Sequence, residues 1–139
     1  GIAYIANVGD SRVYLFRNEK LVQLTEDHTY VNTLLNAGII SEEQAASDSR
    51  KNVITKALGA EDTVEPDFFQ VDIIKDDIFI LCTDGLYDEV DEGSMIEILK
   101  KDSSMSDVCA DMIAAANRNG GHDNITIIAL RVTEEDLYE

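Results

Sequence analysis

Basic residues are scarce in this 139-residue sequence, and long hydrophobic runs do not occur. Eleven lysine and arginine residues face 28 aspartate and glutamate residues, which gives a formal net charge of −17 at pH 7. Nucleic acid and anionic membrane surfaces are therefore not expected as partners, because phosphate contacts require clustered lysine and arginine. No apolar run approaches the roughly 20 residues that span a bilayer. The negative charge indicates solubility or, alternatively, an acidic cleft that concentrates divalent cations.

Cysteine is also rare. Cys82 lies in an apolar, strand-like run and Cys109 in a helical pattern, and the two form no CxxC pair. Both are interpreted as small core residues in a reducing compartment. The two cysteines and two histidines lack the spacing of zinc ligands. The first residues lack the basic and cleavage regions of a secretory signal, so we expect a cytoplasmic protein.

Signatures of nucleophilic catalysis and of nucleotide binding are missing. The segment Gly9-Asp10-Ser11 is not the G-x-S-x-G nucleophile elbow, neither cysteine has a basic neighbour, and no Walker-type glycine loop occurs. After these exclusions, the remaining catalytic mechanism is hydrolysis by a metal-activated water. A bound cation lowers the pKa of water toward neutrality.

Two aspartates stand at the ends of apolar, strand-like runs. Asp84 ends the run that begins at Ile80, and Asp123 precedes the run that begins at Ile125. Carboxylates fixed at strand ends suit Mg2+ or Mn2+, which take oxygen ligands. Each could equally be a turn residue, Asp84 because Gly85 permits a positive φ and Asp123 because such residues favour turns. Spacing alone does not show that the two aspartates meet.

Further polar residues could belong to the same site. Asp10 is a third aspartate at a strand edge, and Arg12 is either a phosphate clamp or, as we favour, a salt-bridge partner of Asp10. His122 could be a general acid, but we expect a loop residue, and we expect His28 to be structural. The acidic cluster 84–92 lacks the spacing of an EF-hand and is interpreted as the solvated start of a helix.

The pattern of elements predicts a layered α+β domain. Short links between successive strands argue for antiparallel pairing, and separate blocks of strands and helices argue against a doubly wound sheet. Thr29 or Asp27, Ser41, Asp91 or Glu92, and Ser104 or Ser106 are expected to begin helices. We expect strands at 2–8, 12–16, 21–24, 53–58, 68–74, 78–82 and 125–132, and helices at 30–35, 41–46, 92–99 and 106–116.

Four ordered motifs resemble a known family. They are Ala6-Asn7-Val8-Gly9-Asp10-Ser11-Arg12, Asp27-His28-Thr29, Ile80-Leu81-Cys82-Thr83-Asp84-Gly85-Leu86 and Gly121-His122-Asp123-Asn124-Ile125-Thr126. With them, the chain resembles a bacterial metal-dependent protein serine/threonine phosphatase of the PP2C (PPM) type. The segment from Arg50 to Gly59 resembles the stretch that follows the flap in the bacterial branch, and the resemblance spans nearly the whole chain.

The resemblance implies a fold and a metal site. The fold would be an antiparallel β-sandwich flanked by helices in four αββα layers, with two Mn2+ or Mg2+ ions between the sheets and room for a third. In that scheme Asp84 and Asp123 are ligands of one metal, with Gly85 and Asn124 beside it. Asp10, with Asp84, matches a weaker third position near the flap, about residues 30–52. Beyond the metal ligands, no catalytic side chain is expected.

The resemblance also implies that part of the site lies elsewhere. The family carries an arginine phosphate clamp, a Glu-Asp pair and an Asp-Gly-x-Gly-Gly turn, and none of them occurs in this sequence. We therefore expect residues 1–139 to be the C-terminal portion of one phosphatase domain, incomplete at its N-terminal side. Alone it should be nearly inactive and prone to self-association through exposed sheet faces and edges.

The expected activity of the complete domain is the hydrolysis of phosphoserine and phosphothreonine in proteins that a serine/threonine kinase has phosphorylated. The alternative from a different class is a non-catalytic interaction module that keeps part of the phosphatase fold. An acidic cation-buffering domain is a weaker idea, because clustered ligand loops are absent.

Overall fold

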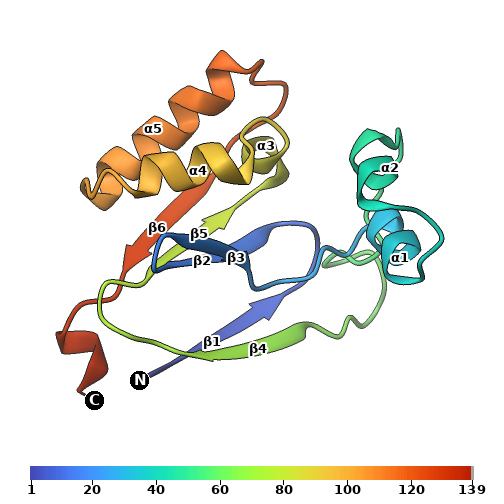
Figure 1. The fold of residues 1–139 in the computed structure, drawn as a ribbon. Coiled ribbons are helices and arrows are strands. Elements are labelled where there is room, and N and C mark those ends of the chain that lie inside the picture. The colour runs from blue at the N-terminus through green and yellow to red at the C-terminus, as the bar shows by residue number, and fades with distance from the viewer. Residues whose placement is uncertain (139) are drawn as a thin grey trace.

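The computed structural model describes residues 1–138, which form two antiparallel sheets with helices beside them (Figure 1). Four strands make the larger sheet and two make the smaller one. The strands are β1 (Ile2–Asn7), β2 (Arg12–Arg17), β3 (Lys20–Gln23), β4 (Asp67–Asp72), β5 (Ile78–Cys82) and β6 (Ile127–Arg131). The helices are α1 (Tyr30–Asn36), α2 (Glu42–Ser47), α3 (Asp84–Tyr87), α4 (Glu92–Leu99), α5 (Met105–Arg118) and the 3-10 turn η1 (Glu135–Leu137).

The larger sheet has the strand order β3-β2-β5-β6, and β1 pairs with β4 in the smaller one. Each pair is antiparallel, as the sequence predicted. The tight turn between β2 and β3 uses Asn18 and Glu19 at φ 52° and 59°, the left-handed conformation that suits a two-residue hairpin. No helix within residues 1–138 is long and apolar enough to cross a membrane.

The helix starts follow the capping residues of the sequence. Thr29 caps α1, and Ser41 forms a complete capping box with Gln44 at the start of α2. Asp91 caps α4, and Ser104 caps α5. In each case the side-chain oxygen accepts a hydrogen bond from a backbone N–H that has no partner within the helix. The predicted helix starts are confirmed.

The main core lies between the larger sheet and the helices α4 and α5. Tyr14 and Ile80 from the sheet, Leu86 from α3, and Met95 and Met112 from the helices are almost completely buried. Along β5, alternate residues face opposite sides of the sheet, and both sides are covered. This explains why β5 is apolar at every position.

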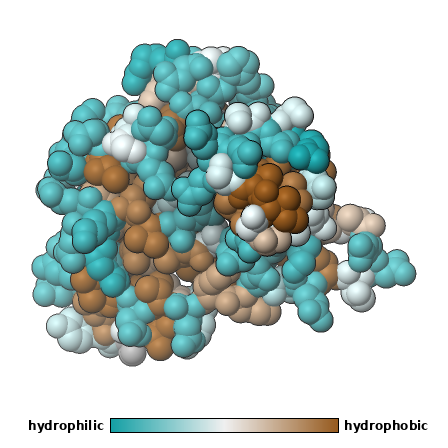
Figure 2. Space-filling model, turned by 45° about the vertical axis from the view of Figure 1, so that its right-hand side comes forward, coloured by the Kyte–Doolittle hydropathy of each residue, from teal (hydrophilic) through white to brown (hydrophobic). Residues whose placement is uncertain are grey.

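The smaller sheet covers part of the other face of the larger one. Val13, Leu15 and Phe79 pack there against residues of β1 and β4. Residues 1–138 thus supply both sheets and one helical layer of the expected αββα arrangement, and none of their helices covers the outer face of β1 and β4 (Figure 1). Apolar patches are open on the face shown in Figure 2. Tyr4, Phe68, Ile128 and Leu130 are each more than half exposed.

Two sequence-based expectations about the strands are wrong. The strands β1 and β2 do not pair, because the loop between them bonds to His28 instead of closing a hairpin: the Gly9 carbonyl accepts from the His28 N–H at 3.0 Å, and the Gly9 N–H donates to the His28 ring. The expected strand 53–58 is also absent, because this segment pairs with its neighbour only at one isolated bridge, Thr29 to Ile54. Val53, Ile54 and Leu58 are exposed.

Candidate metal centre

The start of α3, which carries Asp84, lies against the loop that carries Asp123 at one end of the larger sheet. The Thr83 N–H donates to the Thr126 carbonyl, and the Thr126 N–H donates to the Thr83 hydroxyl, both at 3.1 Å. These bonds hold the end of β5 against the segment that leads into β6, so the two predicted ligands come from adjacent segments.

Gly85 allows this close approach. A β-carbon on Gly85 would overlap the carbonyl oxygen of Asn124 and would lie 3.5 Å from the β-carbon of Asp123. The alternative in which Gly85 adopts the positive φ of a turn is not the one that the structure shows, because the residue lies inside α3 and is absent from the glycines with positive φ. Asn124 contributes through its backbone, whose N–H donates to the Asp123 carboxylate at 2.7 Å.

Asp10 approaches the same region from the loop between β1 and β2. Its backbone carbonyl accepts a hydrogen bond from the Tyr87 hydroxyl at 2.6 Å, which ties this loop to α3. Burial raises the pKa of Asp10, and the negative charge of Asp84 raises it further, with smaller contributions from Asp27 and Asp88. The charges of Asp10 and Asp84 therefore interact.

The carboxylates of Asp84, Asp123 and Asp10 fit a divalent cation as part of its ligand set. Carboxylate oxygens are the ligands of Mg2+ and Mn2+, and Mg2+ is usually held by one or two carboxylates plus waters and phosphate oxygens. The repulsion that raises the pKa of Asp10 is what a bound cation would relieve. Within residues 1–138, however, no three Asp, Glu, His or Cys side chains are placed to hold an ion together. Further ligands would have to complete the centre.

Arg12 makes a salt bridge, but with Asp27 and not with the predicted partner Asp10. Its Nε and one terminal nitrogen donate to the Asp27 carboxylate at 2.6 to 3.2 Å, and the other terminal nitrogen donates to the Tyr14 hydroxyl at 2.8 Å. The guanidinium also lies 3.5 Å from the ring centroid of Tyr87. Burial opposes its charge, yet the bonds to Asp27 outweigh this and raise the pKa of Arg12. Each nitrogen is thus occupied, which supports the structural role.

His28 is structural, as predicted. The ring is buried, its Nδ1 accepts from the Gly9 N–H at 3.0 Å, and its Nε2 lies 2.6 Å from the Asp67 carboxylate. Because Nδ1 is an acceptor, Nε2 carries the proton and donates to Asp67. This bond lowers the pKa of Asp67. His28 therefore fixes the loop that carries Asp10 relative to β4.

His122 is a loop residue, as predicted, and its side chain is largely exposed. Its Nδ1 lies 2.5 Å from the Glu89 carboxylate, and this hydrogen bond lowers the pKa of Glu89. The Glu89 carbonyl also accepts from the Asn119 side chain at 2.7 Å. Glu89 thereby anchors the loop that leads to Asp123.

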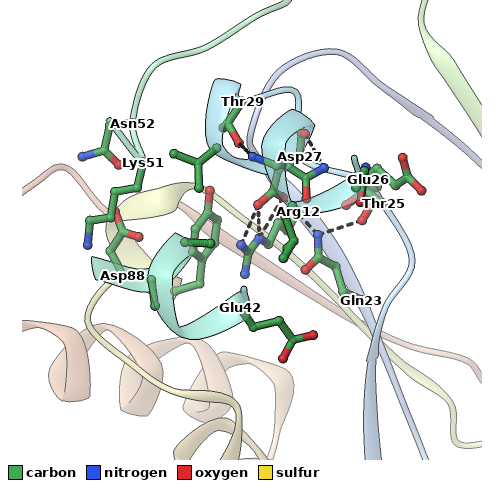
Figure 3. A pocket seen from close by; sticks show the side chains of 17 residues that line it. Arg12, Gln23, Thr25, Glu26, Asp27, Thr29, Glu42, Lys51, Asn52 and Asp88 are labelled. Atoms are coloured by element: carbon green, nitrogen blue, oxygen red, sulfur yellow. Dashed lines mark hydrogen bonds and ion pairs between the residues drawn. The ribbon is translucent and has the colours of Figure 1, made fainter. Parts of the chain in front are cut away.

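A cavity of about 600 Å³ is lined by Tyr87 and Asp88, which follow Asp84 in the chain (Figure 3). It is an open cavity, bordered by α1, α2, β3 with the segment that follows it, the end of α3, and the segment of Lys51 and Asn52. Arg12, Tyr87 and Asp88 form the side that faces the candidate metal centre. Burial raises the pKa of Asp88, and the charge of Asp84 contributes, whereas Lys51 acts in the opposite direction.

Solved structures of bacterial phosphatases share this architecture. The serine/threonine phosphatase of S. agalactiae has a TM-score of 0.90 at 37% identity over 96% of this chain and 55% of that one. The catalytic domain of PstP in complex with two manganese ions has a TM-score of 0.83 at 32% identity over 96% of this chain and 54% of that one. The predicted fold class is confirmed: antiparallel sheets and helices in the arrangement of bacterial serine/threonine phosphatases.

The Protein phosphatase 2C family matches residues 2–125, and the chain belongs to this family. The serine/threonine phosphatase stp of Listeria monocytogenes is 48% identical over 135 residues, which are 97% of this chain and 52% of that protein. The predicted resemblance is confirmed. The chain spans about half the length of the relatives that it matches.

The sequence missed several residues of the site. Asp27 was considered as a helix cap and as part of a family motif, Glu89 only as a member of the solvated acidic cluster, and Tyr87 and Gln23 were not considered at all. Gln23 donates to the Asp27 carboxylate at 3.0 Å and so helps to hold the partner of Arg12. Nothing in the local sequence marks these contacts, because each joins segments that meet only in the folded chain. The place of Asp27 in a family motif was the one available signal.

Proposed function

We propose that this chain acts in the metal-dependent hydrolysis of phosphoserine and phosphothreonine in proteins, within a PP2C phosphatase domain. The observation that carries the proposal is the contact between the loops of Asp84 and Asp123, with Asp10 within electrostatic reach. Membership of the family and relatives named as serine/threonine phosphatases support it. Residues 1–139 are proposed to form one portion of a single domain, with residues 30–52 as its flap.

In this proposal Asp84 and Asp123 hold one Mn2+ or Mg2+ ion, and Asp10 and Asp84 contribute to a weaker site. The cation would supply a water of lowered pKa and charge compensation for the phosphate. The residues around the aspartates position them. Gly85 leaves space for the Asn124 backbone, the Asn124 N–H orients the Asp123 carboxylate, and Tyr87 holds the Asp10 loop.

The alternative, a non-catalytic interaction module, is favoured by one observation. In the part of the chain that the structure describes, three ligating side chains do not gather at one point. An assay of phosphate release distinguishes the phosphatase from the interaction module. We expect Mn2+-dependent release of phosphate from a phosphothreonine peptide by the protein that carries this sequence, and loss of that activity in Asp84→Asn. Full activity in Asp84→Asn, or none in the unsubstituted protein, would contradict the enzyme proposal.

We further propose that residues 1–139 self-associate when expressed alone. Large apolar side chains on the outer face of the smaller sheet and on β6 are exposed, and such surfaces drive association. Light scattering tests this, and a monomer at high concentration would contradict it. The cytoplasmic location and the partner kinase stay predictions.

A further inference from the structure

We propose that the cavity beside Asp88 binds a lysine or arginine side chain of the phosphoprotein substrate, close to the phosphorylated residue. This inference rests on the proposed function and names the class of substrate: phosphoproteins with a basic residue next to the phosphorylation site. It is carried by the position of the cavity, the charge of its lining and its apolar surface.

The cavity adjoins the candidate metal centre. Tyr87 and Asp88 line it, and they lie at the end of the short helix α3 that begins at Asp84. Tyr87 also bonds to the backbone of Asp10 at 2.6 Å. A peptide whose phosphate lies at Asp84 and Asp10 would therefore place a neighbouring residue at the mouth of the cavity.

The charge of the lining favours a cation. Four carboxylates line the cavity, those of Glu26, Asp27, Glu42 and Asp88, against the two cations Arg12 and Lys51. Arg12 and Asp27 neutralise each other in their bidentate pair. The remaining charged groups of the lining are three carboxylates and one lysine, so the lining carries a net negative charge. Figure 3 shows Lys51 beside Asp88 on one wall, with Glu42 on α2.

An anionic occupant is disfavoured because the charge of Arg12 is already paired with the Asp27 carboxylate. Its three nitrogens donate to Asp27 and Tyr14, and one face of the guanidinium lies on the Tyr87 ring. A phosphate or a carboxylate entering the cavity would meet one cation not paired with Asp27, Lys51, against three carboxylates.

The rest of the lining suits the aliphatic part of a long basic side chain. Val31, Leu35, Ala45 and Ala46 line the cavity from α1 and α2. Lysine and arginine pack their methylene groups on such surfaces while the charged group reaches carboxylates or water. The volume of about 600 Å³ lies within the usual range of ligand pockets and accommodates a side chain with the adjacent peptide backbone.

The test is peptide binding by fluorescence anisotropy in EDTA, so that neither metal nor hydrolysis enters. Two labelled, unphosphorylated peptides are compared, identical except that two lysines next to the central threonine are replaced by glutamates. We expect the lysine peptide to bind at least about tenfold more tightly than the glutamate peptide, the effect of a few partly exposed ion pairs.

Matched variants separate the cavity from the general negative charge of the protein. Glu26→Gln with Glu42→Gln should weaken binding of the lysine peptide by about tenfold. Glu61→Gln with Glu65→Gln removes the same charge from exposed residues that do not line this cavity and should change binding by less than about twofold. Lys51→Gln should strengthen binding of the lysine peptide, because it removes the cation that competes for Asp88.

The inference is overturned if both double variants weaken binding equally, if the two peptides bind alike, or if the lysine peptide does not bind. A lysine preference that depends on Glu26 and Glu42, in a protein that hydrolyses no phosphopeptide, would contradict the proposed function and leave the cavity assignment standing.

Discussion

The backbone carbonyl of Asn124 occupies the space that a side chain on Gly85 would need. Asp84 and Asp123 precede these two residues in the sequence, so this contact brings the backbones of the two candidate ligands close together. The same end of β5 is tied to the chain before β6 by the two Thr83–Thr126 hydrogen bonds. The backbone at this end of the sheet thus places the two aspartates beside each other.

Gly85→Ala is expected to separate the two loops. The added methyl group meets backbone atoms that cannot rotate away, so we expect a loss of about 1–3 kcal/mol in the free energy of unfolding and weaker Mn2+ binding. Denaturant unfolding and calorimetry measure the two effects. The control is Gly93→Ala in α4, where the nearest atom to the new methyl group is 3.5 Å away and helix propensity improves. Equal stability of Gly85→Ala and the unsubstituted protein would contradict the contact.

Arg12→Lys is expected to destabilise the protein although it conserves the charge. Lysine cannot reproduce the bidentate bonds to Asp27 and the stacking on Tyr87. With side chains only 21% and 14% exposed, we expect the Arg12–Asp27 pair to lose about 1–3 kcal/mol on this change. Denaturant unfolding measures the loss.

The matched control for Arg12→Lys is Arg50→Lys. Arg50 also makes two side-chain bonds to an aspartate, Asp48, and lies 4.9 Å from an aromatic ring, that of Tyr30, but its side chain is half exposed. Its replacement should leave the unfolding transition almost unchanged. A comparable loss in both variants would show that burial of the Arg12–Asp27 pair adds nothing to the free energy of unfolding.

Asp77→Asn is expected to remove part of the acid sensitivity of the fold. The side chain is 1% exposed; burial alone would raise its pKa, but hydrogen bonds from Arg17 and from the Ile74 N–H outweigh this, so the pKa of Asp77 lies below its ordinary 3.8. A lowered pKa in the folded state stabilises the fold above the unfolded value, and this stabilisation is lost as the pH falls through the folded pKa.

The difference in stability between Asp77→Asn and the unsubstituted protein should therefore be full above about pH 4 and disappear at lower pH. Thermal unfolding across this range measures it. Asp76→Asn is the control, since Asp76 adopts a φ of 68°, which asparagine tolerates. If the Asp77→Asn difference persisted at pH 2, the ion pair with Arg17 would not be its cause.

The sequence predicted local features better than long-range ones. The caps at Thr29, Ser41 and Ser104 follow from side chains that bond within a few residues. The separation of β1 and β2 into different sheets could not be predicted, because it depends on His28, 19 residues from Gly9. The apolar segment 53–58 resembled a strand. Its backbone, however, is hydrogen-bonded to a neighbouring segment only at His28 and Tyr30.

In the candidate site, too, local features were predicted better than long-range ones. Asp84, Asp123 and Asp10 were predictable as strand-edge carboxylates, but their proximity depends on the pairing of β5 with β6 and on the turn of α3 against the Asp10 loop. The partner of Arg12 was predicted wrongly, because Asp10 is close in sequence and Asp27 is close in space.

The most direct test of the metal centre is a calorimetric titration with Mn2+. The unsubstituted protein, Asp84→Asn and Asp123→Asn are compared, with Asp62→Asn as a control for the loss of one charge from an exposed loop. We predict that the unsubstituted protein and Asp62→Asn bind Mn2+ and that Asp84→Asn and Asp123→Asn each lose this binding. Equal Mn2+ binding by all four proteins, or none by the unsubstituted one, would contradict the assignment of Asp84 and Asp123 to a shared cation.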